Sequence, residues 1–509
     1  MFDFVRVSTN ILDEARLDSS YYSNRFLENE EKLANCSIAR EEVFKLTSLC
    51  NCGSTPKKVE YSTDGVGLIR TSDVRPNRFI LDKIARSNDC DIKDSTTAKA
   101  GDMLYTMSGT IGYACVIPEM TEEFSFSNTI ARVRLPEGSI HDIHYISTFF
   151  NSHYGYEQSL RLTSGAIQGH VMPNPFKRLK VSLPASEAQK YIGEKVRQAE
   201  RLRAWAKNAE KVFNQALKSA YPNVFNKMGS GNCYSVARSQ EIDYTLNVGA
   251  FDEERLLTQR YLYEHGGRKL AEIAKIANES TSEYEENQVY IGLSSIASHS
   301  CELKPSTIAE QEVTGTCRIL KSGPVVAKLR PYLNKVSYIP EKLSGSLGST
   351  ELLCIEPNKD TSGWFIYGVL KSELTLKQLR PLASGATHPR IDQYDLRNIV
   401  IPSVENPHEL GQLLEQAQTA YFLSEKCTKL AKLLVEDLIE GQLNESQLAS
   451  AQQALETGDD SLDRALLERM TAEGIDGEGD PLFDDIEQLY DLLEQAKQAL
   501  DADNAMAEA

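Results

Sequence analysis

The stretch GDMLYTMSGTIGYACVIPE, residues 101–119, decides the fold, because the chain repeats it as GPVVAKLRPYLNKVSYIPE at residues 323–341. The two stretches align without a gap at an offset of 222 residues. Each alternates apolar runs with Gly, Ser or Pro, so we expect each to form a β-hairpin. A repeat of this size indicates two duplicated domains rather than a solenoid of short repeats.

The same offset continues on both sides of this stretch. VGLIRTS at residues 66–72 faces QVYIGLS at residues 288–294, again 222 residues later. Looser equivalences pair Leu17-Asp18 with Ile242-Asp243, Lys45-Leu46 with Lys269-Leu270, Ser164-Gly165-Ala166 with Ser384-Gly385-Ala386, and Leu183-Pro184 with Ile401-Pro402. Each copy has the strand and turn composition of a β-rich globule. We interpret Asp18 and Asp243 as capping or turn residues, because they belong to separate globules and cannot share acid–base chemistry.

Each copy passes into a long helix. Ser186 and Gln189 stand at the spacing of a capping box, and Asn406 precedes Pro407 at the first position of the second helix. Apolar residues recur at steps of three and four, as Ile192, Val196, Ala199, Leu202, Ala206, Ala209 and Val212, and as Leu410, Leu414, Ala417, Ala420, Cys427, Leu430, Leu434 and Leu438. A buried seam this narrow favours helix-on-helix packing, so we predict that the two helices pair antiparallel.

The predicted fold class is therefore α+β. Two β-rich globules alternate with two long antiparallel coiled-coil-like helices, and a helical acidic C-terminal extension follows. The predicted boundaries are 1–185 for the first globule, 186–225 for the central spacer helix, 226–402 for the second globule, 403–443 for the second spacer helix and 444–509 for the extension. About 33 helical residues at 1.5 Å each predict a spacer of roughly 50 Å.

The net charge of −18 is uneven along the chain. Residues 451–509 hold 17 acidic and 3 basic side chains, so they carry −14 and leave −4 for the first 450 residues. A local basic groove is compatible with that remainder. In the extension, Asp480-Pro481 predicts a helix start, and Ile486, Leu489, Leu493, Ala496 and Leu500 share one face. This helix would dock on a protein partner or on the chain's own helices, or remain a solvated appendage.

The sequence predicts a cytoplasmic protein without metal. It starts without a basic end followed by an apolar run, and no run of about 18 apolar residues occurs. The ten cysteines form no CxxC pair, which argues against disulfides and a structural zinc site. We interpret the closest pair, Cys50 and Cys52, as two reduced thiols in a strand.

Several motifs carry a resemblance to a known family. They are LIRTSD at 68–73, GDML at 101–104, LIEGQL at 438–443, and in each copy a Ser-Gly-Ala element followed by a hydrophobic-Pro exit. In this order, twice over and each time before a long helix, they make residues 1–450 resemble the specificity subunits of type I restriction-modification systems. The resemblance implies target recognition domains that each read one half of a split DNA site. It also implies conserved spacer helices on which methyltransferase subunits dock.

The family's subunits have no active site of their own, and the sequence agrees with that. It has no Gly-rich methyl-donor turn and no P-loop, and Asn174-Pro175-Phe176 lacks the second proline of a base-holding element. The resemblance implies that the partners are double-stranded DNA, two adenine-N6 methyltransferase subunits that hold the S-adenosylmethionine, and in some systems a restriction-translocase subunit, all serving phage defence. The alternatives are a stand-alone methyltransferase or nuclease, and a helical protein–protein scaffold that does not read DNA.

Candidate DNA contacts are Lys, Arg, Ser and Thr for phosphates, and planar or ring side chains for base edges. In the first copy they are Lys57, Lys58, Arg70, Thr71, Ser72, Arg75, Ser108, Thr110, Thr163, Ser164, Gln168 and His170. In the second copy they are Lys328, Arg330, Tyr332, Lys335, Ser384, Thr387, His388 and Arg390. The glycines of 107–112 would let a phosphate approach the backbone. In the segment 328–335 charged or polar residues alternate with apolar ones, as they do in a half-buried pair of strands. The alternatives are that the basic residues between Lys57 and Arg75 are solvated surface, that 107–112 is a plain tight turn, and that the two histidines have structural roles.

Overall fold

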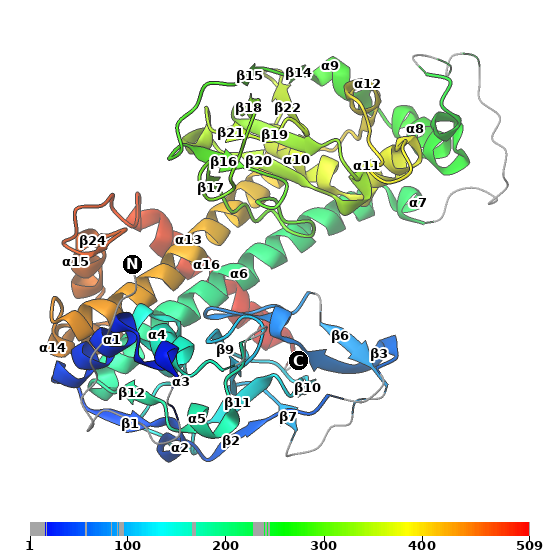
Figure 1. The fold of residues 1–509 in the computed structure, drawn as a ribbon. Helices are drawn as coiled ribbons and strands as arrows, with labels where there is room; N and C mark the ends of the chain where they lie inside the picture. The colour runs from blue at the N-terminus through cyan, green and yellow to red at the C-terminus, as the bar shows by residue number, and fades with distance from the viewer. Residues whose placement is uncertain are drawn as a thin grey trace. The chain divides into compact units, whose positions relative to one another are not determined.

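The computed structural model describes residues 18–55, 59–82, 84–88, 96–164, 169–226 and 245–507, with the single positions 16, 90, 239 and 242. The chain forms two compact units, and each takes residues from separate parts of the sequence. Unit 1 holds residues 1–201 and 423–493, and unit 2 holds residues 202–422 and 494–509. We call the strand-rich part of unit 1 head 1, residues 18–185, and that of unit 2 head 2, residues 245–402 (Figure 1).

Each head contains the same four-stranded antiparallel sheet. In head 1 its order is β2 (Leu49–Cys52), β11 (Ile130–Arg134), β8 (Met103–Thr106) and β9 (Ala114–Val116). In head 2 it is β14 (Ala274–Ala277), β22 (Leu352–Pro357), β19 (Gly323–Ala327) and β20 (Val336–Ile339). The two predicted hairpins are β8–β9 and β19–β20, so the prediction for residues 101–119 and 323–341 is confirmed.

A second sheet in each head contains one parallel pair. Its order in head 1 is β6 (Ala85–Ser87), β3 (Tyr61–Ile69), β10 (Phe124–Phe126) and β7 (Thr97–Ala98). In head 2 it is β17 (Ser306–Thr307), β16 (Val289–Ile291), β21 (Leu347–Gly348), β18 (Cys317–Ile319) and β15 (Ser280–Thr281). Ile69 lies opposite Phe126, and Ile291 lies opposite Gly348, so both strands keep the offset of 222. Because a slip of one residue would turn every side chain to the other face, this shared register shows a duplicated fold.

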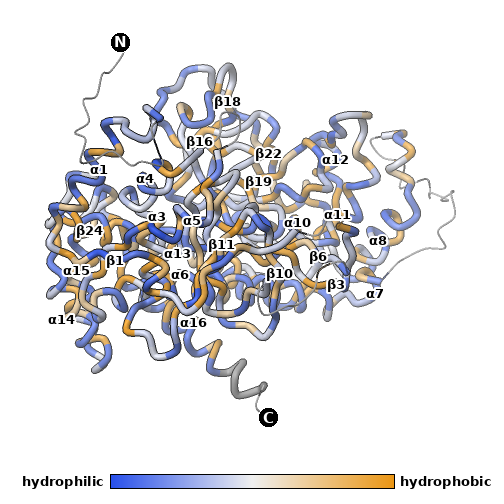
Figure 2. Tube along the Cα trace, turned by 60° about the horizontal axis from the view of Figure 1, so that its bottom comes forward, coloured by the Kyte–Doolittle hydropathy of each residue, from blue (hydrophilic) through white to orange (hydrophobic). Residues whose placement is uncertain are grey.

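The cores of the heads are built from equivalent apolar residues. Ile69 and Ile117 are buried in head 1, as are Ile291 and Ile339 in head 2. Hydrophobic and hydrophilic segments alternate along the chain trace (Figure 2). One helix packs on the antiparallel sheet of each head, α3 (Ile143–Asn151) in head 1 and α10 (Gly363–Lys371) in head 2, and it contacts the helix that follows it, α4 (His153–Arg161) or α11 (Glu373–Leu379).

A short two-stranded sheet closes each head, and it corrects two sequence equivalences. The strands are β1 (Arg40–Glu42) with β12 (Lys180–Ser182), and β13 (Arg268–Lys269) with β23 (Val400–Ile401). Val43 N donates to Leu179 O and Leu270 N donates to Ile399 O, both at 2.9 Å. Val43 therefore matches Leu270, and Leu179 matches Ile399. The predicted matches of Lys45-Leu46 and of Leu183-Pro184 were wrong by three and by two residues.

The two long helices are α6 (Ser186–Ala220) and α13 (Pro407–Glu440), and each has residues in both units. In unit 2 they contact through Tyr421, whose hydroxyl donates to Glu210 at 3.2 Å. The predicted Ser186–Gln189 capping box does not form, because α6 already begins at Ser186 and the Gln189 Oε1 accepts from Asp142 N at 3.3 Å. Pro407 begins α13 as predicted.

The apolar stripe of α6 differs from the prediction. Val212 is 41% exposed, and the stripe passes instead through Phe213 and Leu217. In the first half of the helix Tyr191 and Lys195 are buried as well, so the predicted narrow seam is wrong there. The physical reason is that the C-terminal extension also packs on this stretch. No helix among the described residues combines the length and the apolar character needed to cross a membrane.

The extension consists of α14 (Glu445–Glu456), α15 (Ser461–Arg469), the hairpin β24 (Met470–Thr471) and β25 (Gly474–Ile475), and α16 (Ile486–Ala507). Pro481 does not start a helix but bridges to Thr471. The buried residues of α16 are Leu489, Leu492 and Ala496, whereas Leu500 is 39% exposed, so the predicted stripe was partly wrong.

The extension packs on helices of its own chain within unit 1. Lys195 of α6 donates to Asp463 at 2.6 Å, and Ile475 N donates to Asp437 of α13 at 3.0 Å.

Candidate DNA-recognition faces

Three loop segments meet in head 1. They are the β8–β9 loop, the turn at Ser127–Thr129 and the loop that ends at His170. Met107 N donates to Thr129 O at 2.9 Å, and Val171 N donates to Met107 O at 2.8 Å. Ser164 and His170 exchange backbone hydrogen bonds of 3.0 and 2.9 Å, and His170 also bridges to Ser108.

The equivalent three segments meet in head 2. Lys328 N donates to Glu351 O at 2.8 Å, and Ile391 N donates to Lys328 O at 3.1 Å. Ser384 and Arg390 exchange backbone hydrogen bonds of 3.0 and 2.9 Å, and Arg390 also bridges to Leu329. The structure therefore brings the hairpin loop together with the Ser-Gly-Ala loop in head 2, and with Ser164 and His170, the described ends of that loop, in head 1. We call each convergence of three segments a recognition face.

The two glycines of the head 1 hairpin loop have different roles. Gly109 has φ +76°, and beyond its two chain neighbours only Thr71 Oγ1 among the described residues, at 3.8 Å, lies within 4 Å of a Cβ built there. Gly112, with φ +86°, faces Ser159 and Tyr156 of α4 at 3.0 and 3.1 Å. Only Gly109 therefore leaves room for a phosphate near the backbone. Its neighbour Thr71 joins the recognition face through η2 (Thr71–Asp73).

The head 2 hairpin loop is not the predicted strand pair. It forms the short helix η5 (Pro331–Leu333) between Arg330 at φ +48° and Asn334 at φ +53°. Proline has no backbone N–H for a ladder, and the two left-handed residues turn the chain out of the strand, which explains the wrong prediction. The Asn334 amide donates to Lys371 O at 2.7 Å and fixes the loop to α10.

Most of the predicted contact residues in head 1 are accessible. Ser72, Arg75, Thr110 and Ser164 are exposed, and Arg70, Thr71, Ser108, Thr163 and His170 are half-buried. Arg70 Nε lies 3.5 Å from Asp73 Oδ2. Arg75 lies on β4 (Val74–Arg75), which pairs with β5 (Arg78–Phe79). Lys57, Lys58 and Gln168 lie outside the described residues.

The predicted residues of head 2 fall into two groups. Tyr332, Ser384, Thr387, His388 and Arg390 are exposed, and Lys328, Arg330 and Lys335 are half-buried. Lys335 Nζ donates to Ile296 O, so this side chain is tied to the body of the head. The guanidinium of Arg330 lies 3.5 Å from Thr387 O, which links the hairpin loop to the Ser-Gly-Ala loop.

An open groove of about 770 Å³ lies beside the head 2 face. Lys328, Ser384 and Arg390 line it, together with residues that sequence reasoning missed. The missed lining residues include Asn278, Arg318, Gln393 and Tyr394. The Asn278 amide donates to Gln393 Oε1 at 2.9 Å, so a pair of amides faces the groove. No local motif marks these positions, because they come from three separate segments.

The head 1 face also has polar residues that the sequence did not suggest. Thr55 Oγ1 donates to Asn128 Oδ1 at 3.2 Å, and Ser127 and Thr129 hydroxyls lie 2.8 Å apart. The equivalence of Ser127 with Ser349 is a signal that would have found this turn. Ser127 N donates to Ile69 O and Ser349 N to Ile291 O.

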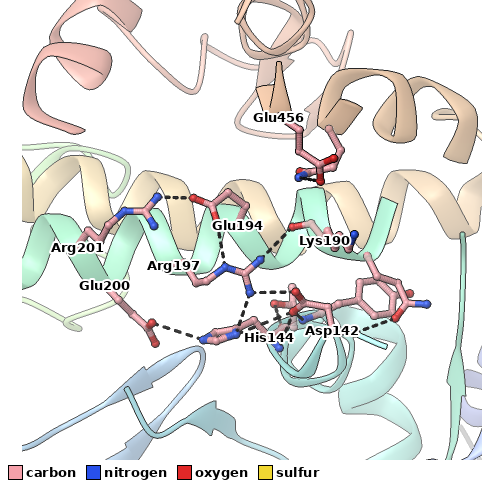
Figure 3. A network of polar contacts seen from close by, with 12 residues as sticks. Asp142, His144, Lys190, Glu194, Arg197, Glu200, Arg201 and Glu456 are labelled. Atoms are coloured by element: carbon pink, nitrogen blue, oxygen red, sulfur yellow. Dashed lines mark hydrogen bonds and ion pairs between the residues drawn. The ribbon is translucent and has the colours of Figure 1, made fainter. Parts of the chain in front are cut away.

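Head 1 is fixed to α6 by a polar network (Figure 3). Arg197 donates to Asp142 and to Glu194, both at 2.9 Å, and Asp142 caps α3 by accepting from His144 N and Tyr145 N. Burial alone would raise the pKa of the Glu194 carboxyl, but the nearby arginines lower it. Head 2 is fixed to the helices differently. A Cβ on Gly368 would lie 2.2 Å from Phe213 of α6 and 2.4 Å from Leu414 of α13.

Other residues singled out from the sequence have structural roles. Asp18 caps η1 (Ser19–Tyr22) as predicted, whereas Asp243 lies outside the described residues. Cys50 lies in a strand, as predicted, and burial raises the pKa of its thiol to about 11, which keeps it protonated. Phe176 is buried in α5 (Pro173–Lys177) and stacks on Tyr105 at 4.3 Å, so it cannot hold a flipped base. Among the described residues, no three His, Cys, Asp or Glu side chains gather as metal ligands.

Comparisons with known proteins give one sequence family. The family model for the type I restriction modification DNA specificity domain matches residues 40–210, from β1 into α6. No curated protein matches the chain. The chain is similar to a type I restriction-modification S subunit from M. genitalium at 13% identity, with 82% of this chain and 96% of that chain covered and a TM-score of 0.38. It is similar to the HsdS subunit of Thermoanaerobacter tengcongensis at 14% identity, with 80% and 97% covered and a TM-score of 0.27.

Proposed function

Because this chain belongs, through residues 40–210, to the type I restriction-modification DNA specificity family, we propose that both heads read DNA and together recognise one bipartite site. Specificity subunits of this family are not enzymes, and they supply sequence recognition to partner subunits. The chain is accordingly a specificity subunit and not a stand-alone methyltransferase or nuclease.

One observation supports a second reading domain outside the matched segment. Head 2 repeats the four-stranded antiparallel sheet of head 1 and the parallel register of its second sheet, to which it adds the fifth strand β15, and it repeats the convergence of three loops. Loops held on a rigid scaffold are where binding residues concentrate. Because the loop residues differ between the heads, the two half-sites differ in sequence.

We place the DNA contacts on the two recognition faces. In head 1 the phosphates of one half-site are contacted by Arg70, Thr71, Arg75, Ser108 and Thr110, with Ser72, Thr163 and Ser164 beside them. In head 2 the phosphates of the other half-site are contacted by Lys328, Arg330, Tyr332, Ser384 and Thr387. His170, His388 and Arg390 face base edges, because ring and guanidinium groups match the acceptors of the major groove. Lys57, Lys58 and Gln168 remain candidates from the sequence, and Lys335 is the weakest one.

The helices α6 and α13 provide the docking surface for the partners. We propose that they run antiparallel along their length and that two adenine-N6 methyltransferase subunits, which hold the S-adenosylmethionine, bind to them in the cytoplasm. A restriction-translocase subunit would complete a phage-defence system. The chain itself then needs no cofactor.

Exchange of one head tests the proposal. Head 2 would be replaced by the corresponding segment of another specificity subunit with a known target, and the methylated motif would be mapped by sequencing in cells with the methyltransferase. We expect one half of the motif to change and the other half to stay. An unchanged motif, or a change in both halves, would contradict two independent readers. A scaffold that does not read DNA would show no salt-sensitive affinity for a duplex.

A further inference from the structure

A charged pair stands on the head 2 recognition face, and the equivalent described positions of head 1, Thr129 and His170, hold no such pair. Arg390 Nη2 lies 3.1 Å from Glu351 Oε1, and Arg390 Nε lies 3.3 Å from both Glu351 carboxylate oxygens. The Arg390 side chain is 49% exposed, whereas that of Glu351 is 24% exposed. The carboxylate thus lies deeper in the face and the guanidinium lies further out, along the groove wall.

Both residues are held by their backbones. Glu351 O accepts from Lys328 N at 2.8 Å, and Glu351 N donates to Ser349 Oγ at 3.2 Å. Arg390 is joined to Ser384 by two backbone hydrogen bonds. A side chain whose backbone and carboxylate partner are both fixed loses little further freedom when it binds a ligand, so the pair is pre-organised.

The pairing leaves one edge of the guanidinium available. Nε and Nη2 face the carboxylate, whereas Nη1 makes only a long contact, 3.4 Å, with His388 O. The Nη1–Nη2 end of an arginine matches the two acceptors, O6 and N7, that guanine presents in the major groove. A carboxylate at this distance would repel a phosphate, so the pair favours a base edge over the DNA backbone.

We propose that Arg390 reads a guanine in the half-site of head 2 and that Glu351 is the positioning residue that orients it. This inference rests on the proposed function and names the base that one side chain selects. In head 1 the equivalent backbone positions hold Thr129 and His170, which form no such pair. The guanine preference therefore belongs to one half of the bipartite site.

The test uses the complete complex of the chain with its methyltransferase. The methylated motif is mapped by sequencing for the wild-type chain, and binding to duplexes with each base at every position of the head 2 half-site is then measured. Arg390→Ala should reduce the preference for guanine over other bases at one position by roughly 10- to 100-fold. Glu351→Gln should reduce the preference at that same position by a smaller factor, and Glu351→Asp should restore part of it.

A double variant separates positioning from mere structural support. If Glu351 acts through Arg390, the Glu351→Gln, Arg390→Ala chain should match Arg390→Ala alone in base preference. Arg380 is a matched control, because it is 48% exposed, close to the 49% of Arg390, and pairs with Glu373 at 3.3 Å in the same head. Arg380→Ala should leave the motif unchanged.

The outcomes are distinct. If the wild-type chain reads a motif and Arg390→Ala keeps the same base preference, the inference is overturned and the proposed function stands. The same holds if the two single variants act at different positions, or if the first half-site changes. A wild-type complex without any sequence preference overturns the proposed function, and the inference with it.

Discussion

Lys195 of α6 and Asp463 of the C-terminal extension form a buried ion pair, with 2.6 Å between Nζ and Oδ1 and 1% exposure of each side chain. The hydroxyls of Tyr191 and Tyr490 also donate to the Asp463 carboxylate. Both oxygens of this carboxylate therefore have a partner, and the extension up to residue 493 is part of unit 1.

Removing one partner of this pair should destabilise unit 1. Asp463→Asn leaves the Lys195 ammonium buried without a counter-charge, which costs about 3–5 kcal/mol in comparable buried pairs. Lys195→Met with Asp463→Leu should cost less, because it removes both charges. Urea unfolding of the full chain measures both. As a control, loss of the exposed Lys426–Asp484 pair should cost less than about 1 kcal/mol.

Low pH should loosen the same contact. Burial alone would raise the pKa of Asp463, but Lys195 and the hydrogen bonds lower it. A carboxyl with a lowered folded-state pKa stabilises the protein above its unfolded pKa, near 3.8, and this contribution is lost as the pH falls through the folded value. The melting temperature should therefore fall more steeply below about pH 4 for the wild type than for the chain with Lys195→Met and Asp463→Leu, and the two should run parallel above that pH. Equal slopes would contradict this.

Two glycines of the extension should respond differently to alanine. Gly474 has φ +118°, and a Cβ there would lie 2.6 Å from Asp437 Oδ1, the carboxylate that accepts from Ile475 N. Gly458 has φ +85°, and no described atom beyond Gly458 and its two chain neighbours lies within 4 Å of its Cβ position. Gly458→Ala should cost only left-handed strain, about 1 kcal/mol. Gly474→Ala should lower the melting temperature clearly further, and equal shifts would refute the close approach.

In unit 2, a buried glutamate should make stability pH-dependent. Burial raises the pKa of Glu210 to about 7, and its neighbours are Cys301, Tyr421 and Lys371. The folded chain then holds this proton more tightly than the unfolded chain, so the free energy of unfolding falls as pH rises from about 4.5 to about 7, by up to about 1.4 kcal/mol per pH unit. Lys371, whose pKa burial lowers to about 7, stays largely protonated in both states below that pH. The melting temperature should fall less steeply with rising pH in Glu210→Gln than in the wild type. In the control Glu264→Gln it should fall as steeply as in the wild type.

Negative charge on either recognition face should weaken DNA binding. Thr110→Asp in head 1 and Thr387→Asp in head 2 each place a carboxylate on an exposed loop, where it repels phosphates. We expect each variant to lose several-fold in affinity for a duplex with the mapped motif, and more at low salt. Thr457→Asp adds the same charge to the extension and should leave affinity unchanged. Equal losses in all three variants would place the DNA elsewhere.

The duplication and the paired hairpins were predictable because they depend on local patterns and on an ungapped offset. The joining of Ser108 with His170, and of Leu329 with Arg390, was not, because each partner comes from a different segment. Glu351 carries no motif, and its role depends on the register of β22 with β19. Helical periodicity placed Val212 inward, yet the neighbouring Phe213 is buried because it packs on Phe365 of α10. The Lys195–Asp463 contact joins residues 268 positions apart, beyond any local signal.

The discontinuous make-up of unit 1 has a consequence for synthesis on the ribosome. Residues 1–201 emerge first, but the segment 423–493 that completes their core emerges only after almost the whole of unit 2. Domains usually fold as they leave the ribosome, starting from the N-terminus. Here the surface of α6 that the segment 423–493 covers in the complete chain stays exposed while more than two hundred further residues are translated. Translation that stops before the extension would therefore release chains prone to aggregation, even though the residues of both recognition faces had already been synthesised.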